Sequence, residues 1–188
     1  MSNKTYKVVA FGGGTGLSKI LEGLKEFYPS PISEINAIVA TSDDGGSTGI
    51  LREEFHMPAP GDVRRCIAAL SQRNDLLRQL FEYRFDNVES GLHRHSFGNL
   101  MLTALREITG SFSKAVQMAS SLLDTAGNVI PISDEDVTLV AKFDNGMVIK
   151  GEILIYQYGK LKRGKIELGV EADFFLFDIK SLQIKELF

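Results

Sequence analysis

The stretch YKVVAFGGGTGLSKILEGLKEF, residues 6–27, decides the fold of this chain. Its apolar, β-branched start predicts a strand, which the glycines of residues 12–16 interrupt. Leucine and isoleucine then recur at Leu17, Ile20, Leu21 and Leu24, which predicts a helix with one buried face. A second apolar run follows at residues 35–41. Strand, helix and strand in this order predict a parallel, right-handed βαβ unit and an α/β fold.

The stretch TSDDGGSTGILREEF, residues 41–55, follows the second predicted strand. The carboxyl ends of parallel strands meet at one edge of a sheet, where α/β proteins bind ligands. Asp43 and Asp44 repel phosphate directly, so they are candidates to hold Mg²⁺, to accept hydrogen bonds from a ribose or base, or to receive a proton from a hydroxyl. Alternatively, Asp44 caps a turn and Asp43 the start of an adjacent helix.

The glycine loop after the first strand is a candidate phosphate site, because backbone N–H groups and a helix dipole favour an anion there. It matches no standard fingerprint: a dinucleotide-binding G-x-G-x-x-G would need glycine at Leu17, and a Walker A loop would need G-K-[ST]. The alternative interpretation is a tight strand-to-helix turn.

The stretch PAPGDVRRC, residues 58–66, ends a proline-rich turn. Asp62 has the residue type and position of a helix N-cap. Arg64 and Arg65 either pair with phosphate or lie on a solvated helix face. Cys66 lies in an apolar stretch and is expected in the core.

The stretch GLHRHSFGN, residues 91–99, combines two histidines with small polar groups before an apolar helix. The chain has three histidines and one cysteine, which does not complete a zinc ligand set around His93 and His95. His95, Ser96 and Asn99 are candidates to hydrogen-bond a ligand, and Ser96 alternatively caps the helix.

Length and composition favour one main domain, since the chain has 188 residues, 44% of them hydrophobic. The net charge of −3 gives no overall attraction to nucleic acid or an anionic membrane. A single cysteine excludes an internal disulfide, and no apolar run near 18 residues predicts a membrane span. Met1 leads into the first strand without the features of a secretory signal, so we expect a cytoplasmic protein.

The remainder of the chain changes from helical to strand-like patterns. Helices are predicted over residues 62–72, 75–85, 97–110 and 111–125, with Gly110 in a terminating position. Strands are predicted over residues 128–133, 137–143 and 147–158, with a hairpin turn at DNG, residues 144–146.

Taken together, VVAFGGGTGLS, AIVATSDDGGSTGILREEF, PAPGDVRRCIAAL, LFEYRF, HRHSFGNLMLTALREITG and GEI resemble the YvcK/CofD family, from about Tyr6 to Glu152. The resemblance implies a Rossmann-like parallel sheet with flanking helices. Members of one branch, the YvcK-type gluconeogenesis factors, bind nucleotide sugars and support cell-wall morphogenesis. Those of the other are 2-phospho-L-lactate transferases, which move a 2-phospho-L-lactyl group from a lactyl-diphosphoguanosine donor onto a deazaflavin. FEYRF and HSFGN resemble the YvcK branch more.

The resemblance implies a nucleotide diphosphate or UDP-sugar ligand, with Mg²⁺ possible and no organic cofactor. Asp44 is the candidate metal ligand, and Asp44 and Asp62 are the candidate catalytic residues if the chain is a transferase. The candidate nucleotide-binding residues are Gly12, Gly13, Gly14, Thr15, Gly16, Asp43, Asp44, Gly45, Gly46, Ser47, Thr48, Arg64, His95, Ser96 and Asn99.

The sequence departs from the family pattern after Glu152. Members usually run well past 300 residues and carry a second phosphate-loop block of the GPGS kind, which has no counterpart here. GKIELGVEADFFLFD, residues 164–178, instead resembles the closing β segment of amidohydrolases. We therefore expect a truncated nucleotide-binding domain at residues 1–152 and a β-rich tail at residues 153–188. An incomplete sheet has an exposed edge, which predicts self-association, and an inactive fragment is a further hypothesis.

Overall fold

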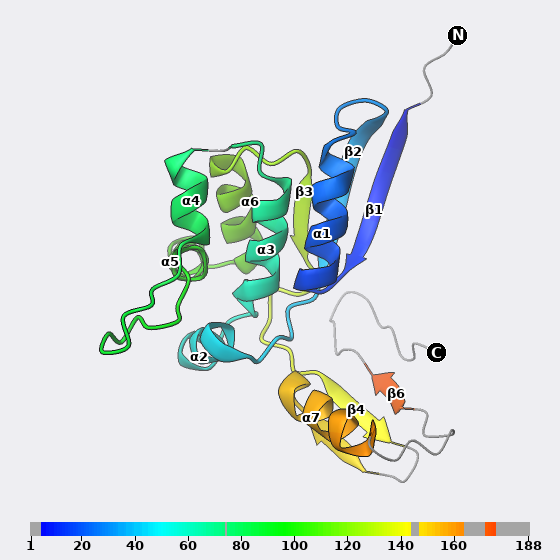
Figure 1. Ribbon diagram of the computed structural model, residues 1–188, viewed down its shortest axis with the longest axis vertical. Helices are drawn as coiled ribbons and strands as arrows, with labels where there is room; N and C mark the ends of the chain where they lie inside the picture. Colours follow the sequence, from blue (N-terminus) through cyan, green and yellow to red (C-terminus); the bar gives the residue numbers. More distant parts are fainter. Residues whose placement is uncertain (1–4, 74, 144–146, 164–171, 176–188) are drawn as a thin grey trace.

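The computed structural model describes residues 5–73, 75–143, 147–163 and 172–175. Strand β1 (Tyr6–Gly12), helix α1 (Gly14–Lys25) and strand β2 (Ile32–Val39) form the predicted parallel βαβ unit. Strand β3 (Asn128–Pro131) pairs parallel to β2, so the sheet has the order β1-β2-β3 (Figure 1). The predicted α/β class is confirmed.

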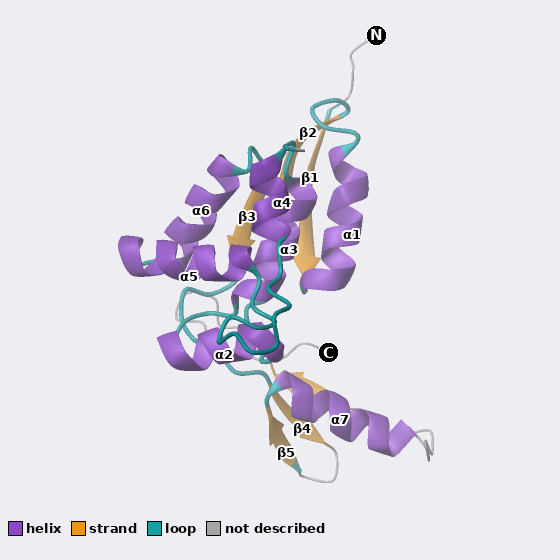
Figure 2. Ribbon diagram, turned by 60° about the vertical axis from the view of Figure 1, so that its left-hand side comes forward, coloured by secondary structure: helices purple, strands orange, loops and turns teal. Residues whose placement is uncertain are grey.

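Five helices connect β2 to β3. Of these, α3 and α6 pack with α1 against the sheet, and α2 lies beyond the ends of the strands (Figures 1 and 2). Helix α3 is central, because it contacts α1, α4, α5, α6, β2 and β3. The glycine stretch after β2, expected as a loop, already becomes helix at Gly46. The five helices are α2 (Gly46–Phe55), α3 (Pro60–Leu70), α4 (Leu76–Glu82), α5 (Phe97–Thr109) and α6 (Phe112–Leu122).

The main core lies between the sheet and α3. Every second residue of β2 points into it, and Ile35, Ala37 and Val39 are fully buried. Burial of one such branched apolar side chain contributes about 1.5–3 kcal/mol. Leu17 and Leu21 of α1 are buried as predicted, whereas Ile20 is 57% exposed because no described element covers its side of α1.

A smaller second unit follows β3. Strands β4 (Val140–Phe143), β5 (Val148–Lys150) and β6 (Ala172–Phe175) form an antiparallel sheet of order β5-β4-β6. The antiparallel pairing of β4 with β5 confirms the predicted hairpin, whose turn at residues 144–146 lies outside the described residues.

The strand predicted over residues 147–158 is wrong beyond Lys150. Helix α7 (Glu152–Arg163) starts there, directly after Gly151 at φ 95°. Ile155 of α7 packs against Ala141 and Phe143 of β4, and this contact selects a helix from an apolar pattern that also suits a strand. The first part of the expected β-rich tail is therefore helical. Of the amidohydrolase-like stretch, only residues 172–175 lie within the described residues.

The described helices include none that is both long and apolar enough to cross a membrane.

Candidate functional site

The amino terminus of α1 meets the first turn of α3. The backbone N–H of Gly14 donates to the carboxylate of Asp62. A Cβ on Gly14 would lie 2.2 Å from Asp62 Oδ1, and a Cβ on Gly13 would lie 3.1 Å from Oδ2. A side chain at residue 14 would therefore displace the Asp62 carboxylate and the end of Arg65. The position where a phosphate would bind this helix already holds a carboxylate, so the first glycine loop is a poor phosphate site in this structure.

Asp62 is not the N-cap that its sequence position suggested. Helix α3 starts at Pro60, a residue suited to the first helical position, and Ala59 is the N-cap. Asp62 therefore lies within the first turn, where Arg65 Nη1 donates to its Oδ1 at 3.1 Å. Burial, reinforced by the nearby charge of Asp43, raises the pKa of the Asp62 carboxyl, and the Gly14 N–H and Arg65 oppose this shift.

Two further carboxylates lie close to Asp62. Asp43 Oδ1 accepts from the Gly45 N–H at 2.9 Å, immediately before α2. Glu152 stands at the start of α7, and burial, followed by repulsion from Asp43, Asp62 and Asp44, raises its pKa. These carboxyl groups concentrate negative charge beside the glycine loop. The described residues contain no group of three His, Cys, Asp or Glu side chains arranged to hold a metal ion.

Asp44, whose charge also acts on Glu152, lies at the start of α7. Its Oδ1 accepts from the Ile153 N–H at 3.0 Å, which satisfies one of the unpaired donors at the start of α7. A Cβ on Gly151 would lie 2.6 Å from Asp44 Oδ2, so the carboxylate is held closely against this turn. In the described structure, Asp44 acts as a helix cap.

We predict that Asp44→Ala destabilises α7 by about 1 kcal/mol, the usual loss for a helix cap. Hydrogen exchange should then accelerate at the first amides of α7. Asp75→Ala is the matched control, because Asp75 caps α4 by accepting from the N–H groups of Leu77 and Arg78. It should accelerate exchange in α4 alone. Unchanged exchange in α7 of Asp44→Ala would contradict the capping role.

Three arginines, Arg64, Arg65 and Arg84, lie near the amino terminus of α2, in contrast to the carboxylates near the start of α1. A pocket of about 270 Å³ lies there, formed by residues of α2, α3 and α5 and by the segment that precedes α5. Arg64 is only 8% exposed, and its Nε has no hydrogen-bond partner among the described residues. Burial and the charges of Arg84 and Arg65 lower the pKa of Arg64 to about 10. The pocket is lined by Asp43, Gly45, Gly46, Ser47, Thr48, Gly61, Arg64, Arg65, Arg84 and Asn99.

A buried polar network supports this pocket from behind. Ser47, in the first turn of α2, has its Oγ 3.0 Å from His95 Nδ1, and it accepts from Asn99 Nδ2 at 3.2 Å. Asn99 is 2% exposed, and its Oδ1 has no partner among the described residues. Ser96 has the capping role, since its Oγ accepts from the Asn99 N–H. The network fixes the start of α2 relative to α5.

The candidate nucleotide-binding residues thus divide into three groups. Asp43, Gly45, Gly46, Ser47, Thr48, Arg64 and Asn99 share one pocket, with His95 behind it. The loop of residues 12–16 faces Asp62 and Arg65, and Thr15 Oγ1 accepts from Arg65 Nη1 at 3.0 Å. Asp44 and Ser96 cap helices.

Sequence reasoning did not include Arg84, Gly61 or Glu152 among the site residues, and it named Arg65 only as one that either pairs with phosphate or lies on a solvated helix face. Arg84 Nη1 donates a hydrogen bond to the Arg94 carbonyl. The chain between these residues reverses direction, so that Arg84 forms an isolated antiparallel β-bridge with Ser96. No local pattern in FEYRF indicates this placement. Gly61 is required because its Cβ would lie 2.2 Å from Thr48 Oγ1, a contact between two helices.

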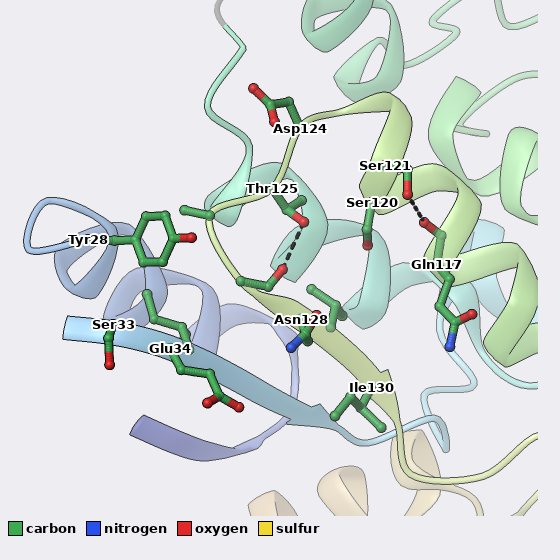
Figure 3. A pocket seen from close by; sticks show the side chains of 14 residues that line it. Tyr28, Ser33, Glu34, Gln117, Ser120, Ser121, Asp124, Thr125, Asn128 and Ile130 are labelled. Carbon is green, nitrogen blue, oxygen red and sulfur yellow. Dashed lines mark hydrogen bonds between the residues drawn. The ribbon is translucent and has the colours of Figure 1, made fainter. Parts of the chain in front are cut away.

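A larger pocket of about 520 Å³ lies beside β3, towards the start of β2 and beneath α6 (Figure 3). Figure 3 shows Glu34 and Asp124 among its polar side chains, together with Tyr28 and Ser120. The described residues that line it include no lysine, arginine or histidine. It therefore lacks the charge that a phosphate ligand needs, and it lies at the end of the strands opposite to the glycine loops.

Comparison with known proteins shows the family of this chain. The family model described as 2-phospho-L-lactate transferase CofD matches residues 8–173, most of the chain. The chain belongs to the CofD family. This confirms the YvcK/CofD resemblance, and the predicted fold is confirmed by solved structures of the same family.

Relatives of this CofD-family chain are gluconeogenesis factors. A putative gluconeogenesis factor of Aquifex aeolicus (strain VF5) is 51% identical, over 89% of this chain and 51% of the relative. The gluconeogenesis factor of Bacillus subtilis (strain 168) is 46% identical, over 84% of this chain and 48% of the relative. A crystal structure of protein BH3568 from Bacillus halodurans matches with a TM-score of 0.77 and 46% identity, over 83% of this chain and 49% of that chain. The chain spans about half the length of these relatives.

Proposed function

We propose that this chain binds the diphosphate of a UDP-sugar type nucleotide sugar in the pocket at the amino terminus of α2. In this proposal it acts as a gluconeogenesis factor, a binding regulator that supports cell-wall morphogenesis and cell shape. Membership of the CofD family supports a nucleotide-related ligand, and the gluconeogenesis factors among the relatives support the regulatory branch.

The observation that carries the proposal is Arg64. Among the described residues, no carboxylate lies within ion-pair distance of this buried guanidinium. Removing its charge from water therefore destabilises the folded chain, because no direct ion pair offsets the lost hydration. A phosphate bound beside Arg64 and Arg84 would offset this desolvation cost through charge-assisted hydrogen bonds. The start of α2 adds backbone N–H groups and the positive end of the helix dipole.

The acidic cluster beside the pocket suits the sugar. Asp43 and Asp62 repel a phosphate, yet their oxygens accept hydrogen bonds from hydroxyl groups. A diphosphate at Arg64 with its sugar directed towards the carboxylates would match the charge pattern along the site. In this proposal, the nucleobase is bound by the part of the family fold that lies outside the half matched by this chain.

A second candidate function is a 2-phospho-L-lactate transferase. The raised pKa of Asp62 favours it, because a carboxylate with a raised pKa is a stronger general base. Asp62 would take the proton of a deazaflavin hydroxyl as the hydroxyl oxygen bonds to the lactyl-bearing phosphorus. The bond from that phosphorus to the guanosine monophosphate oxygen would break, releasing guanosine monophosphate.

Calorimetric titration of the chain with UDP-sugars and with guanine nucleotides, each with and without Mg²⁺, tests these functions. Reversible UDP-sugar binding without turnover supports the regulator. Release of guanosine monophosphate from lactyl-diphosphoguanosine, only in the presence of the deazaflavin acceptor, supports the transferase. Absence of binding to every nucleotide by a folded chain would overturn both and favour the inactive fragment.

A further inference from the structure

The second unit, formed by β4, β5, β6 and α7, has a core of its own. Its buried residues Ala141, Phe143 and Ile155 form a cluster separate from the main core. Among the described residues, its helix and strands pack against one another and against no helix or strand of the main unit. Figures 1 and 2 show this unit beyond the carboxyl ends of β1, β2 and β3, near α2. Its position therefore depends on connecting segments and on individual side chains.

Arg52 of α2 makes the first attachment to the second unit. It is 7% exposed, and its Nη2 donates to Thr138 Oγ1 at 2.8 Å. Its Nε donates to Asp136 Oδ1, and its Nη1 donates to the Ser42 carbonyl at 3.3 Å. Asp136 and Thr138 belong to the segment between β3 and β4. One buried guanidinium thus joins the entry of the second unit to α2 and to the segment before α2.

The segment before α2 makes the second attachment, at the start of α7. Asp44 Oδ1 accepts from the Ile153 N–H, and a Cβ on Gly45 would lie 3.9 Å from Ile153 Cδ1. Both attachments therefore belong to the stretch of residues 42–52. The same stretch contributes Gly45, Gly46 and Ser47 to the pocket beside Arg64. A shift at the pocket end of α2 thus reaches both attachments, because a helix moves as a rigid element.

Glu152, the first residue of α7, opposes the docked position of this helix when no ligand is bound. Its carboxylate is repelled by Asp43, Asp62 and Asp44. Asp43 also lines the pocket. Ligand hydroxyl groups that donate hydrogen bonds to these carboxylates would offset the repulsion. Such a ligand binds the docked arrangement more tightly than a detached one and shifts the population towards it.

We propose that occupation of the pocket at the amino terminus of α2 is coupled to docking of the second unit, so that the position of α7 changes with ligand binding. The ligand strengthens the attachments at Asp44 and Arg52, and a docked second unit raises ligand affinity by the same factor. The coupling gives the proposed regulator a part whose position depends on the ligand. The choice of a UDP-sugar rests on the proposed function, whereas the link through α2 rests on the contacts of Arg52 and Asp44.

Hydrogen exchange of the full chain tests the coupling in two measurements. In the first, saturating UDP-glucose should slow exchange at the first amides of α7 about tenfold, within the usual range of coupling between sites. Amides of α6, which does not line the pocket, should keep their rates. Asp136→Asn alters an attachment outside the pocket, at a side chain that is 37% exposed. It should abolish the protection of α7 and weaken UDP-glucose binding about fivefold by calorimetry.

The second measurement needs no ligand. In the ligand-free chain, Asp136→Asn should accelerate exchange about fivefold at the first amides of both α2 and α7. The ion pair of Asp136 is with Arg52, so an effect at the Asp44 attachment must pass through α2.

Arg78→Gln is the matched control, because it breaks an ion pair with Glu82 on the surface of α4. It should leave both measurements unchanged. Circular dichroism and thermal unfolding check that each variant is folded. Thr138→Val, which removes a single hydrogen bond of Arg52, replaces Asp136→Asn if the latter unfolds.

The outcomes separate the coupling from the proposed function. UDP-glucose binding that protects the start of α2 and leaves α7 unchanged would overturn the coupling and leave the proposed function standing. Full protection of α7 in the folded Asp136→Asn variant would also overturn the coupling. If UDP-glucose does not bind, the proposed function fails and the second measurement decides: unchanged exchange of α7 in that variant overturns the link through α2.

Discussion

Replacing Arg64 by methionine is expected to weaken UDP-sugar binding by about ten- to a hundredfold, the loss of one or two charge-assisted hydrogen bonds. The same change should stabilise the ligand-free chain by about 1–3 kcal/mol, because it removes a buried charge that Glu82 and Asp62 offset only in part. Methionine retains the apolar stem, whose Cδ and Cγ lie against Gly98. Opposite effects on affinity and stability distinguish a binding residue from a structural one.

Calorimetry measures the affinity and thermal unfolding measures the stability. Arg78→Met is the matched control, since Arg78 pairs with Glu82 on the surface of α4 at 3.2 Å. It should change neither quantity appreciably. If Arg64→Met lowers the melting temperature and leaves the affinity unchanged, the guanidinium has a structural role and the pocket at α2 is not the phosphate site.

The second large effect is expected from Gly14→Ala. The added Cβ would lie 2.2 Å from Asp62 Oδ1 and 2.9 Å from Arg65 Nη1, so both side chains must move. We expect a loss of about 1–3 kcal/mol from overpacking, together with the loss of the Gly14 N–H to Asp62 hydrogen bond. UDP-sugar affinity should fall as well, because Asp62 and Arg65 border the site.

Gly16→Ala provides the control within the same loop. A Cβ on Gly16 would meet nothing within 4 Å, and the residue is already helical. Alanine should therefore be neutral there or stabilise by about 0.5–1 kcal/mol. Chemical denaturation of both variants checks the difference. Equal stabilities for the two variants would show that the α1–α3 contact tolerates a side chain.

The α/β class and most of the elements followed from local patterns. Apolar runs of strand length, helical spacing of leucines and glycine punctuation predicted β1, α1 and β2, and Gly110 ended α5 in the left-handed conformation as predicted. These features depend on residues close in the chain, which a sequence displays directly. For the same reason Ser96 was recognised as a possible cap.

Helix α7 is an element whose type the local sequence pattern did not predict. Its apolar residues suit a strand or a helix, and the decision comes from contacts of Ile155 with β4 and from Asp44, 109 residues earlier, at its first turn. Such long-range contacts outweigh weak intrinsic preferences.

The sequence predicted which residues are candidates for the site, and the structure shows how those residues are arranged. The sequence by itself determined that two glycine loops, the paired carboxylates and Arg64 lie at one end of the sheet, because the parallel strand order places them there. Only the tertiary structure decided which helix end carries the unpaired arginine beside which we propose that an anion binds. Asp62 occupies the start of α1, while Arg84 joins Arg64 at the start of α2. Charges distant in sequence sum through space, so the sign of the field at each loop depends on the folded packing of α2, α3 and α5.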